Sequence, residues 1–284
     1  LRSLPIEVVR SVRVDFMGTF LVGIGLVALL YGCLQGPHAG WDLLTIACLP
    51  FAVFCLFVFF RYERRVDPAH AVFPQSLRRN PRFLVAALFG LFAALGVFAL
   101  TFLVSNYIQS VLGQTAFWAG FVLAPASIAS VVTAPIAGRW VDEGEARLVL
   151  QIGFGASAVG TALSMLIAAM GGSWVWFLGA TVVFGIGNGF VMAPLTTVGM
   201  TALRGDEFGA ASSLLNVLRQ AGPVLGGAVV GLLMQMLAAM PTEVDPLGIS
   251  SSVVAWVLGV PLLLFIVGLF VYSFVPRSLV SAID

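Results

Sequence analysis

The sequence predicts an all-α membrane protein with eight transmembrane helices. Three observations lead to this prediction: charged residues are scarce, eight apolar runs reach spanning length, and arginine alternates between the connections. Of the 284 residues, 60% are hydrophobic and only 10% are charged, and the mean hydropathy is +1.05. Soluble domains carry about 25% charged residues because their surface must face water. Most of the surface of this chain is therefore expected to face lipid.

Eight apolar runs are long enough to cross a bilayer. A hydrocarbon core of about 30 Å needs roughly 20 apolar residues in a helix. Lipid offers no partner to unpaired backbone groups, so such runs form helices rather than isolated strands. The runs are 15–35, 43–61, 83–108, 116–137, 147–170, 174–199, 209–237 and 252–275. We expect these boundaries to hold within about three residues.

Arginine divides the connections between the runs into two classes. All 14 basic residues are arginines, and they lie mainly in both tails and in every second connection. The connections without arginine are 35–42, 109–115, 171–173 and 238–251. Cytoplasmic loops carry an excess of basic residues. The alternation therefore predicts a multi-pass protein with both termini of this chain on the cytoplasmic side.

A long connection rich in arginine and proline separates a pair of runs from a block of six. We expect a cytoplasmic N-terminal stretch, two extra transmembrane helices, a cytoplasmic loop, a six-helix unit and a cytoplasmic tail. Their ranges are 1–14, 15–61, 62–82, 83–277 and 278–284. The chain starts at Leu1 rather than at a methionine, so we expect it to be the last part of a longer protein.

Residue types that carry enzymatic or metal chemistry are rare in this sequence. The two histidines, His38 and His70, fall in connections on opposite sides of the predicted membrane and lack metal-ligand spacing. The three cysteines show neither metal spacing nor a disulfide pattern. The net charge of +1 gives no sign of a nucleic-acid partner. The sequence therefore predicts no enzyme, no metal, no cofactor and no nucleic-acid binding.

Four groups of short motifs carry a resemblance to a known family. They are Asp15-x-x-Gly18 with Gly40-Trp41; the loop from Glu63 to Phe83; Tyr107-Ile108-Gln109-x-x-x-Gly113 with Trp118-Ala119-Gly120 and Pro125; and Met192-Ala193-Pro194-Leu195-Thr196-Thr197 with Ala210-Ala211-Ser212-Ser213-Leu214-x-Asn216. In order and spacing they resemble the major facilitator superfamily, specifically its fourteen-span drug:proton antiporters of the EmrB/QacA type. The resemblance implies two extra spans and then the C-terminal six-helix half of a facilitator fold. An N-terminal six-helix half would be the missing partner.

The same resemblance implies proton-driven efflux of small amphipathic or hydrophobic compounds across a bacterial inner membrane, and hence multidrug resistance. Substrate would bind near the midplane, between two halves that rock about it. Proton coupling is implied by the resemblance alone, because the last six spans hold no carboxylate in their interior. Two alternatives stay open. In the first, the protein is a facilitator-superfamily exporter of another cargo, such as a lipid, siderophore or metabolite. In the second, the chain is a truncated fragment that does not transport.

One polar face in the seventh run carries the main candidate site. Ser212, Asn216, Arg219, Gln220 and Pro223 fall within about 100° on a helix of 3.6 residues per turn. Arg219 lies roughly 15 Å into the span. A charge at that depth needs a cavity or a partner, unless the side chain reaches back to the cytoplasmic interface. No acidic residue of the other spans is an obvious partner.

Three further polar residues are candidates for the substrate pathway. Asn106 and Gln109 lie near the outer end of the third run, and Asn188 lies in the sixth. Hydrogen bonds between helices would explain these residues equally well.

Glycines in the last six runs favour close helix packing. Gly185, Gly187 and Gly189 alternate along the sixth run, and the seventh holds the pairs Gly222/Gly226 and Gly227/Gly231. Small residues let helix backbones approach closely in membranes. A phosphate-binding loop would need a preceding strand and surrounding water, and neither is predicted.

Gly138-x-x-x-Asp142 lies at a predicted cytoplasmic turn. In the superfamily the matching loop acts as a latch between helices that rearrange during transport. The family usually has a basic residue after the aspartate and a glycine two further on, where Glu143 and Glu145 stand here. Only Arg147 keeps the basic character. Two interpretations stay open. The segment is a latch formed by Gly138, Asp142 and Arg147, or Asp142 simply caps the next helix.

Overall fold

The part of the chain that the structure describes is helical. This computed structural model describes residues 16–36, 42–63, 77, 79–200, 203, 207–238 and 251–274. The elements are α1 (Phe16–Gln35), α2 (Leu43–Glu63), α4 (Pro81–Asn106), the π-helical segment η1 (Tyr107–Val111), α5 (Ala116–Asp142), α6 (Ala146–Ala169), α7 (Trp174–Met200), α8 (Phe208–Ala238) and α9 (Ser251–Phe274). The predicted stretches 1–14 and 278–284 and most of the loop 62–82 lie outside the described residues.

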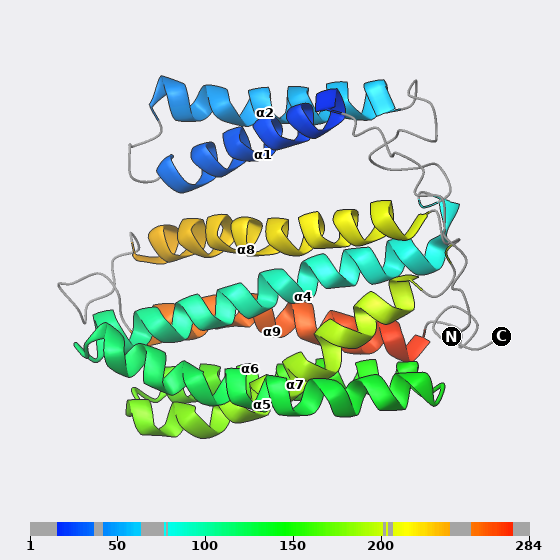
Figure 1. Ribbon diagram of the computed structural model, residues 1–284. Helices are drawn as coiled ribbons and strands as arrows, with labels where there is room; N and C mark the ends of the chain where they lie inside the picture. The colour runs from blue at the N-terminus through cyan, green and yellow to red at the C-terminus, as the bar shows by residue number, and fades with distance from the viewer. Residues whose placement is uncertain are drawn as a thin grey trace, which may run out of the picture.

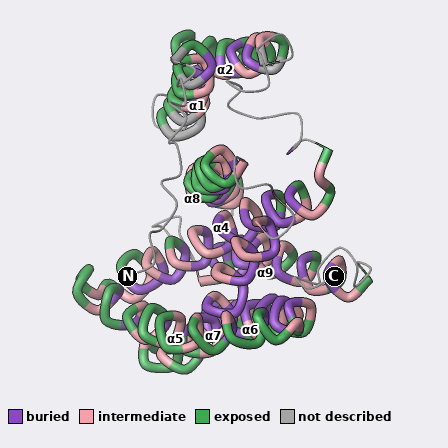
Figure 2. Tube along the Cα trace, turned by 45° about the vertical axis from the view of Figure 1, so that its right-hand side comes forward, coloured by how far each residue is buried: buried purple, intermediate pink, exposed green. Residues whose placement is uncertain are grey.

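The helices run roughly parallel or antiparallel to one another in layers (Figure 1). α1 and α2 form an antiparallel hairpin on one side, where α1 meets α8. α8 packs on α4, and α4 in turn contacts α7 and α9. On the far side, α7 packs between α5 and α6, and α6 also packs on α9. Buried residues are concentrated along α4, α6, α7 and α9, whereas α8 and the hairpin keep wide exposed surfaces (Figure 2).

Six stretches among the described residues are long and apolar enough to cross a membrane. They are Pro81–Val111, Ala116–Asp142, Ala146–Ala169, Trp174–Met200, Phe208–Leu237 and Ser251–Phe274. In α1 and α2 the described apolar stretches, Phe20–Leu29 and Leu43–Phe59, are shorter than a span. The prediction of an all-α, multi-pass membrane protein is confirmed, and the count of eight spans stays a prediction.

One predicted helix end is wrong by more than three residues. The fourth run was expected to end at residue 137, but α5 continues to Asp142. The backbone N–H of Glu143 still donates to the carbonyl of Arg139 at 3.0 Å. The turn comes only at Gly144, whose φ of +91° is a conformation that glycine adopts without strain. The connection therefore comprises residues 143–145, whereas the predicted runs leave 138–146 between them.

α4 begins at a strong local signal. The side-chain oxygen of Asn80 accepts hydrogen bonds from the backbone N–H groups of Arg82 at 3.0 Å and Phe83 at 3.3 Å. Pro81 follows at the first helical position, where its missing N–H would have had no partner inside the helix. The cap fixes the start of the helix that supports one wall of the candidate site.

The other end of α4 widens into the π-helical segment η1. Tyr107 at this junction is fully buried, and its hydroxyl donates to the carbonyl of Gly172 at 3.0 Å. Gly172 lies in the turn between α6 and α7, after Gly171, whose φ is +65°. This end of α4 is thereby tied to the α6–α7 turn.

Glycines on α7 bring it into close contact with both neighbours, as predicted. A Cβ atom added at Gly185 would overlap the backbone of Ala126 in α5, and one at Gly187 would overlap the backbone of Ser157 in α6. Gly189, Gly222 and Gly226 also face neighbouring helices closely. Gly231 faces open space, so the predicted packing role of the pair Gly227/Gly231 is wrong at that residue.

Candidate substrate site

α8 has a packed face and a polar exposed face. Ala211 and Leu215 are buried, and a Cβ atom at Gly222 would meet Leu91 and Ala94 of α4. The predicted polar arc lies on the adjoining face. Its members Ser212, Asn216, Arg219 and Gln220 are exposed, and Pro223 is half-buried. Packing on α4 thus leaves these polar groups turned away from the apolar core.

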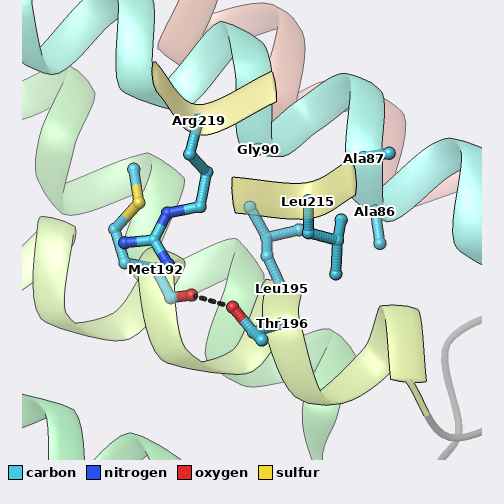
Figure 3. A pocket seen from close by; sticks show the side chains of 8 residues that line it. All are labelled: Ala86, Ala87, Gly90, Met192, Leu195, Thr196, Leu215 and Arg219. Carbon is cyan, nitrogen blue, oxygen red and sulfur yellow. Dashed lines mark hydrogen bonds between the residues drawn. The ribbon is translucent and has the colours of Figure 1, made fainter. Parts of the chain in front are cut away.

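Arg219 lines a recess where α4, α7 and α8 meet. The recess is small: it encloses about 10 Å³, close to the room that a single water needs. Its lining residues are Ala86, Ala87, Gly90, Met192, Leu195, Thr196, Leu215 and Arg219. Figure 3 shows the Arg219 side chain reaching from α8 toward Met192 on α7, while Ala86, Ala87 and Gly90 line the recess from α4.

Arg219 lies far from either end of an apolar helix, on the exposed side of that helix. Arg219 is eleven residues beyond Phe208, where α8 begins, which corresponds to about 16 Å along the helix. Among the described helices, acidic residues occur only at the last positions of α2 and α5, Glu63 and Asp142. No hydrogen bond or ion pair joins Arg219 to another residue that the structure describes. An arginine at such a depth is costly unless a cavity or a partner receives it.

Three lining residues, Met192, Leu195 and Thr196, come from the part of α7 around a proline. Pro194 lies inside this helix and has no N–H to donate to the preceding turn. The hydroxyl of Thr196 donates to the carbonyl of Met192 at 3.2 Å (Figure 3). This segment carries part of the family resemblance, but its place in the site was not predicted. A hydroxyl two residues after a proline within an apolar run was the available signal.

The other predicted pathway residues do not line this recess. The amide nitrogen of Asn188 donates to the Ser130 hydroxyl of α5 at 3.2 Å, which matches the alternative of a hydrogen bond between helices. Gln109 is exposed and donates to the Ser105 hydroxyl at 2.8 Å within its own segment. The side-chain oxygen of Asn106 is buried without a hydrogen-bond partner, and so is that of Asn188. Of the predicted set, the recess contains Arg219, while Asn216 and Gln220 share its helix face.

The predicted latch residues divide between two roles. Asp142 is exposed and ends α5, and α6 starts after Glu145 with no side-chain cap. The prediction that Asp142 caps α6 is therefore wrong, because α5 extends through the segment where the cap was expected. The latch role of Gly138 and Asp142 stays a prediction.

Arg147 links α6 to the end of α9. Its Nε donates to the carbonyl of Tyr272 at 3.0 Å, and Nη2 donates to the carbonyl of Ser273. The last carbonyls of a helix have no partner inside it, and a cation is favoured at that end of the helix dipole. Next to this link, the Gln151 amide donates to the Ser273 hydroxyl at 3.1 Å. This role was not predicted because both acceptors are distant in the chain.

Long apolar helices, one of which carries an arginine far from its ends, indicate a membrane protein with a functional site, and comparison with known proteins identifies its family. The family profile described as Major Facilitator Superfamily matches residues 13–227. Because this match covers most of the chain, the chain belongs to the major facilitator superfamily.

Several similar proteins are named for antibiotic or multidrug resistance. Multidrug resistance protein Stp of Mycobacterium tuberculosis is 29% identical over 78% of this chain and 41% of Stp. Methylenomycin A resistance protein of Bacillus subtilis is 28% identical over 81% of this chain and 49% of its own length. Puromycin resistance protein pur8 of Streptomyces alboniger is 30% identical over 78% of this chain and 44% of its own length. The chain thus spans less than half the length of these curated relatives.

Proposed function

We propose that this chain is part of a proton-coupled efflux antiporter for small amphipathic or hydrophobic compounds, of the fourteen-span EmrB/QacA type, in a bacterial inner membrane. The observation that carries the proposal is Arg219, a charged residue far from either end of an apolar helix, where it lines a small recess between three helices. A structural role in a lipid-facing helix does not require such a charge, whereas a substrate path does. Membership of the superfamily and the names of the relatives support efflux.

In this proposal the chain supplies two extra spans and the second six-helix half of the transporter. The ranges 15–61 and 83–277 form these parts, and both termini of the chain are cytoplasmic. Substrate binds between this half and an N-terminal half, facing the exposed side of α8. The pathway residues are Asn106, Gln109, Asn188, Asn216, Arg219 and Gln220. Gly138 and Asp142, with Arg147, form the cytoplasmic latch.

The carboxylate that couples transport to protons lies outside the described helices in this proposal. A coupling carboxylate must lie where its pKa lets it bind and release a proton during the cycle. Within the described helices, acidic residues stand only at helix ends. We therefore infer that the coupling carboxylate lies in the N-terminal half.

Inverted membrane vesicles test this function with the whole protein as its host makes it. We expect uptake of a fluorescent probe, ethidium or 1-anilinonaphthalene-8-sulfonate, when respiration acidifies the vesicle interior. Nigericin, which collapses the pH gradient, should stop the uptake. Vesicles from a strain without the gene are the control.

The vesicle experiment separates the parts of the proposal. Equal uptake in both strains, for both probes, contradicts efflux by this protein. Uptake that depends on the gene and survives nigericin contradicts proton coupling. Export of a lipid or siderophore would be supported if neither probe moved while that cargo did.

A further inference from the structure

Aromatic rings gather at one end of the helix bundle. Trp118 and Trp174, at the starts of α5 and α7, lie with their ring centroids 4.5 Å apart. The ring of Phe117 lies 5.6 Å from that of Trp118. The ring of Phe121 lies 6.3 Å from that of Trp174. Phe117 is 70% exposed and Phe121 is 48% exposed, so this aromatic cluster continues to the surface of the molecule.

We propose that the aromatic cluster and the neighbouring Trp176 form an anchor in the headgroup layer of one bilayer leaflet, with their indole rings level with the lipid carbonyls and phosphates. In the proposed orientation this is the leaflet on the side away from the cytoplasm. The inference goes beyond transport, because it assigns a lipid partner to this surface.

The exposed indole is the first argument. Trp176 is the third residue of α7 and is 71% exposed. α9 begins at the same end of the bundle, on the left in Figure 1, and it too carries an exposed tryptophan near its start, Trp256. None of these indole N–H groups donates a hydrogen bond to a residue that the structure describes. Hydrocarbon offers such a donor no acceptor, whereas water and lipid headgroups do.

The distribution of charge is the second argument. Among the described residues, Trp140 is the one tryptophan at the opposite end, next to Arg139. The arginines that the structure describes also lie at that end, apart from Arg219. They are Arg61, Arg79, Arg82, Arg139 and Arg147. Tryptophan is enriched at both membrane–water interfaces, whereas basic residues are concentrated on the cytoplasmic side. The two ends therefore differ as the two faces of a membrane protein do.

Length is the third argument. Phe117, Ile128 and Arg139 are all exposed on α5 and follow one another at intervals of eleven residues. Eleven residues make three helical turns and about 20°, so the three side chains lie along one side of the helix. This stripe is about 33 Å long at a rise of 1.5 Å per residue, close to the hydrocarbon thickness of about 30 Å. When Arg139 reaches one headgroup layer, the aromatic cluster therefore lies at the other.

Depth-dependent quenching of tryptophan fluorescence tests the anchor. The whole protein is reconstituted into vesicles of phosphatidylcholine and phosphatidylglycerol that carry a nitroxide either on the headgroup or near the end of an acyl chain. One variant keeps Trp176 alone, with every other tryptophan replaced by phenylalanine. The control is Ile128→Trp in a background without tryptophan, because Ile128 is 65% exposed and lies in the middle of the stripe. Size-exclusion chromatography shows whether each variant is folded.

We expect Trp176 to lie about 15 Å from the bilayer centre, which is half the hydrocarbon thickness. The headgroup nitroxide should therefore quench Trp176 more strongly than the acyl-chain nitroxide. Ile128→Trp should show the reverse order, because its indole lies near the bilayer centre. If the single-tryptophan background does not fold, the native protein is compared with Trp176→Phe, and the quenching that this variant loses belongs to Trp176.

Two results would overturn the inference. Stronger quenching of Trp176 by the acyl-chain nitroxide would place it in the hydrocarbon. Quenching by neither lipid would mean that protein or bulk water surrounds Trp176, whether the protein is another part of the chain or a second copy. The depth measurement needs no transport, so an absence of export in the vesicle assay rejects efflux and leaves the anchor standing. A displaced Trp176 rejects the anchor and leaves efflux standing.

Discussion

Glycines on α7 differ in their surroundings. Gly185 faces α5 so closely that a Cβ atom would overlap the backbone of Ala126. Gly179, six residues earlier on the same helix, has nothing within 4 Å of such an atom. Both are helical glycines in one apolar helix, so they form a matched pair for measuring the value of close helix contact.

We predict that Gly185→Ala destabilises the protein and Gly179→Ala does not. Forcing atoms into a packed contact costs about 1–3 kcal/mol, whereas alanine in open helix is favoured over glycine by roughly 0.5–1 kcal/mol. Thermal unfolding in detergent, followed by tryptophan fluorescence, measures both effects. Equal unfolding midpoints for the two variants would show that α5 and α7 are not held at this distance.

At the scale of elements, helix ends connect parts of the fold that are distant in sequence. Arg147 near the start of α6 donates to two carbonyls at the end of α9. We predict that Arg147→Leu lowers the free energy of unfolding by about 1.5–3 kcal/mol, the usual contribution of hydrogen bonds to a charged group.

Gln151→Leu is the matched control for Arg147→Leu. It removes one neutral bond to the Ser273 hydroxyl, so its cost should be smaller, about 1 kcal/mol. Hydrogen exchange in the last turn of α9 locates the effect. An unchanged exchange rate there in Arg147→Leu would contradict the link between the two helices.

The stability of the protein should depend on pH through Asp42 at the start of α2. Asp42 precedes this helix, and its carboxylate accepts hydrogen bonds from the Thr45 hydroxyl at 2.7 Å and from the Thr45 backbone N–H at 2.9 Å. These bonds, the side-chain bond first, hold the pKa of the Asp42 carboxyl below its usual value of 3.8. The stabilisation is therefore complete above that value and is lost as the pH falls through the lower pKa of the folded state.

Asp42→Asn tests this dependence, because asparagine also caps helices and does not titrate. We predict that the native protein loses stability relative to Asp42→Asn as the pH falls from about 6 to about 3. Unfolding midpoints of both proteins across this range give the answer. Parallel curves would mean that the ionised carboxylate contributes nothing to the cap.

At the scale of the whole molecule, the exposed side of α8 should face water in the assembled transporter. Asn216 and Gln220 lie there, whereas Val217 is an exposed apolar residue about 100° around the same helix from Asn216 and about 60° from Gln220. Polar side chains suit a substrate path, which contains water and polar groups, whereas apolar side chains suit lipid, which contains neither.

Single cysteines in a background free of native cysteines test this assignment. We predict that Asn216→Cys and Gln220→Cys react with a charged maleimide in native membranes, and that 1-anilinonaphthalene-8-sulfonate slows the reaction. Val217→Cys should react much more slowly. Equal rates at all three positions would contradict a water-filled path along this side of α8.

Much of the fold could be predicted from sequence because it depends on neighbouring residues. Apolar length and arginine placement located the helices, and the spacing of Asn216, Arg219 and Gln220 located a polar face. The end of α5 was missed because Gly138 was interpreted as a turn, while the chain turns only at Gly144. Helical hydrogen bonds continue until a residue interrupts them, and no residue between the two glycines does so.

Taken alone, the sequence determined that the chain is a bundle of membrane helices and that one of them carries an arginine far from either end. Both are properties of contiguous segments, since hydropathy and helical spacing act over a few turns. Only the tertiary structure decided what surrounds that arginine. Gly90, Met192 and Thr196 reach it from two other helices, and the distance between helices depends on how their whole faces pack. The same holds for Arg147, whose acceptors lie on α9.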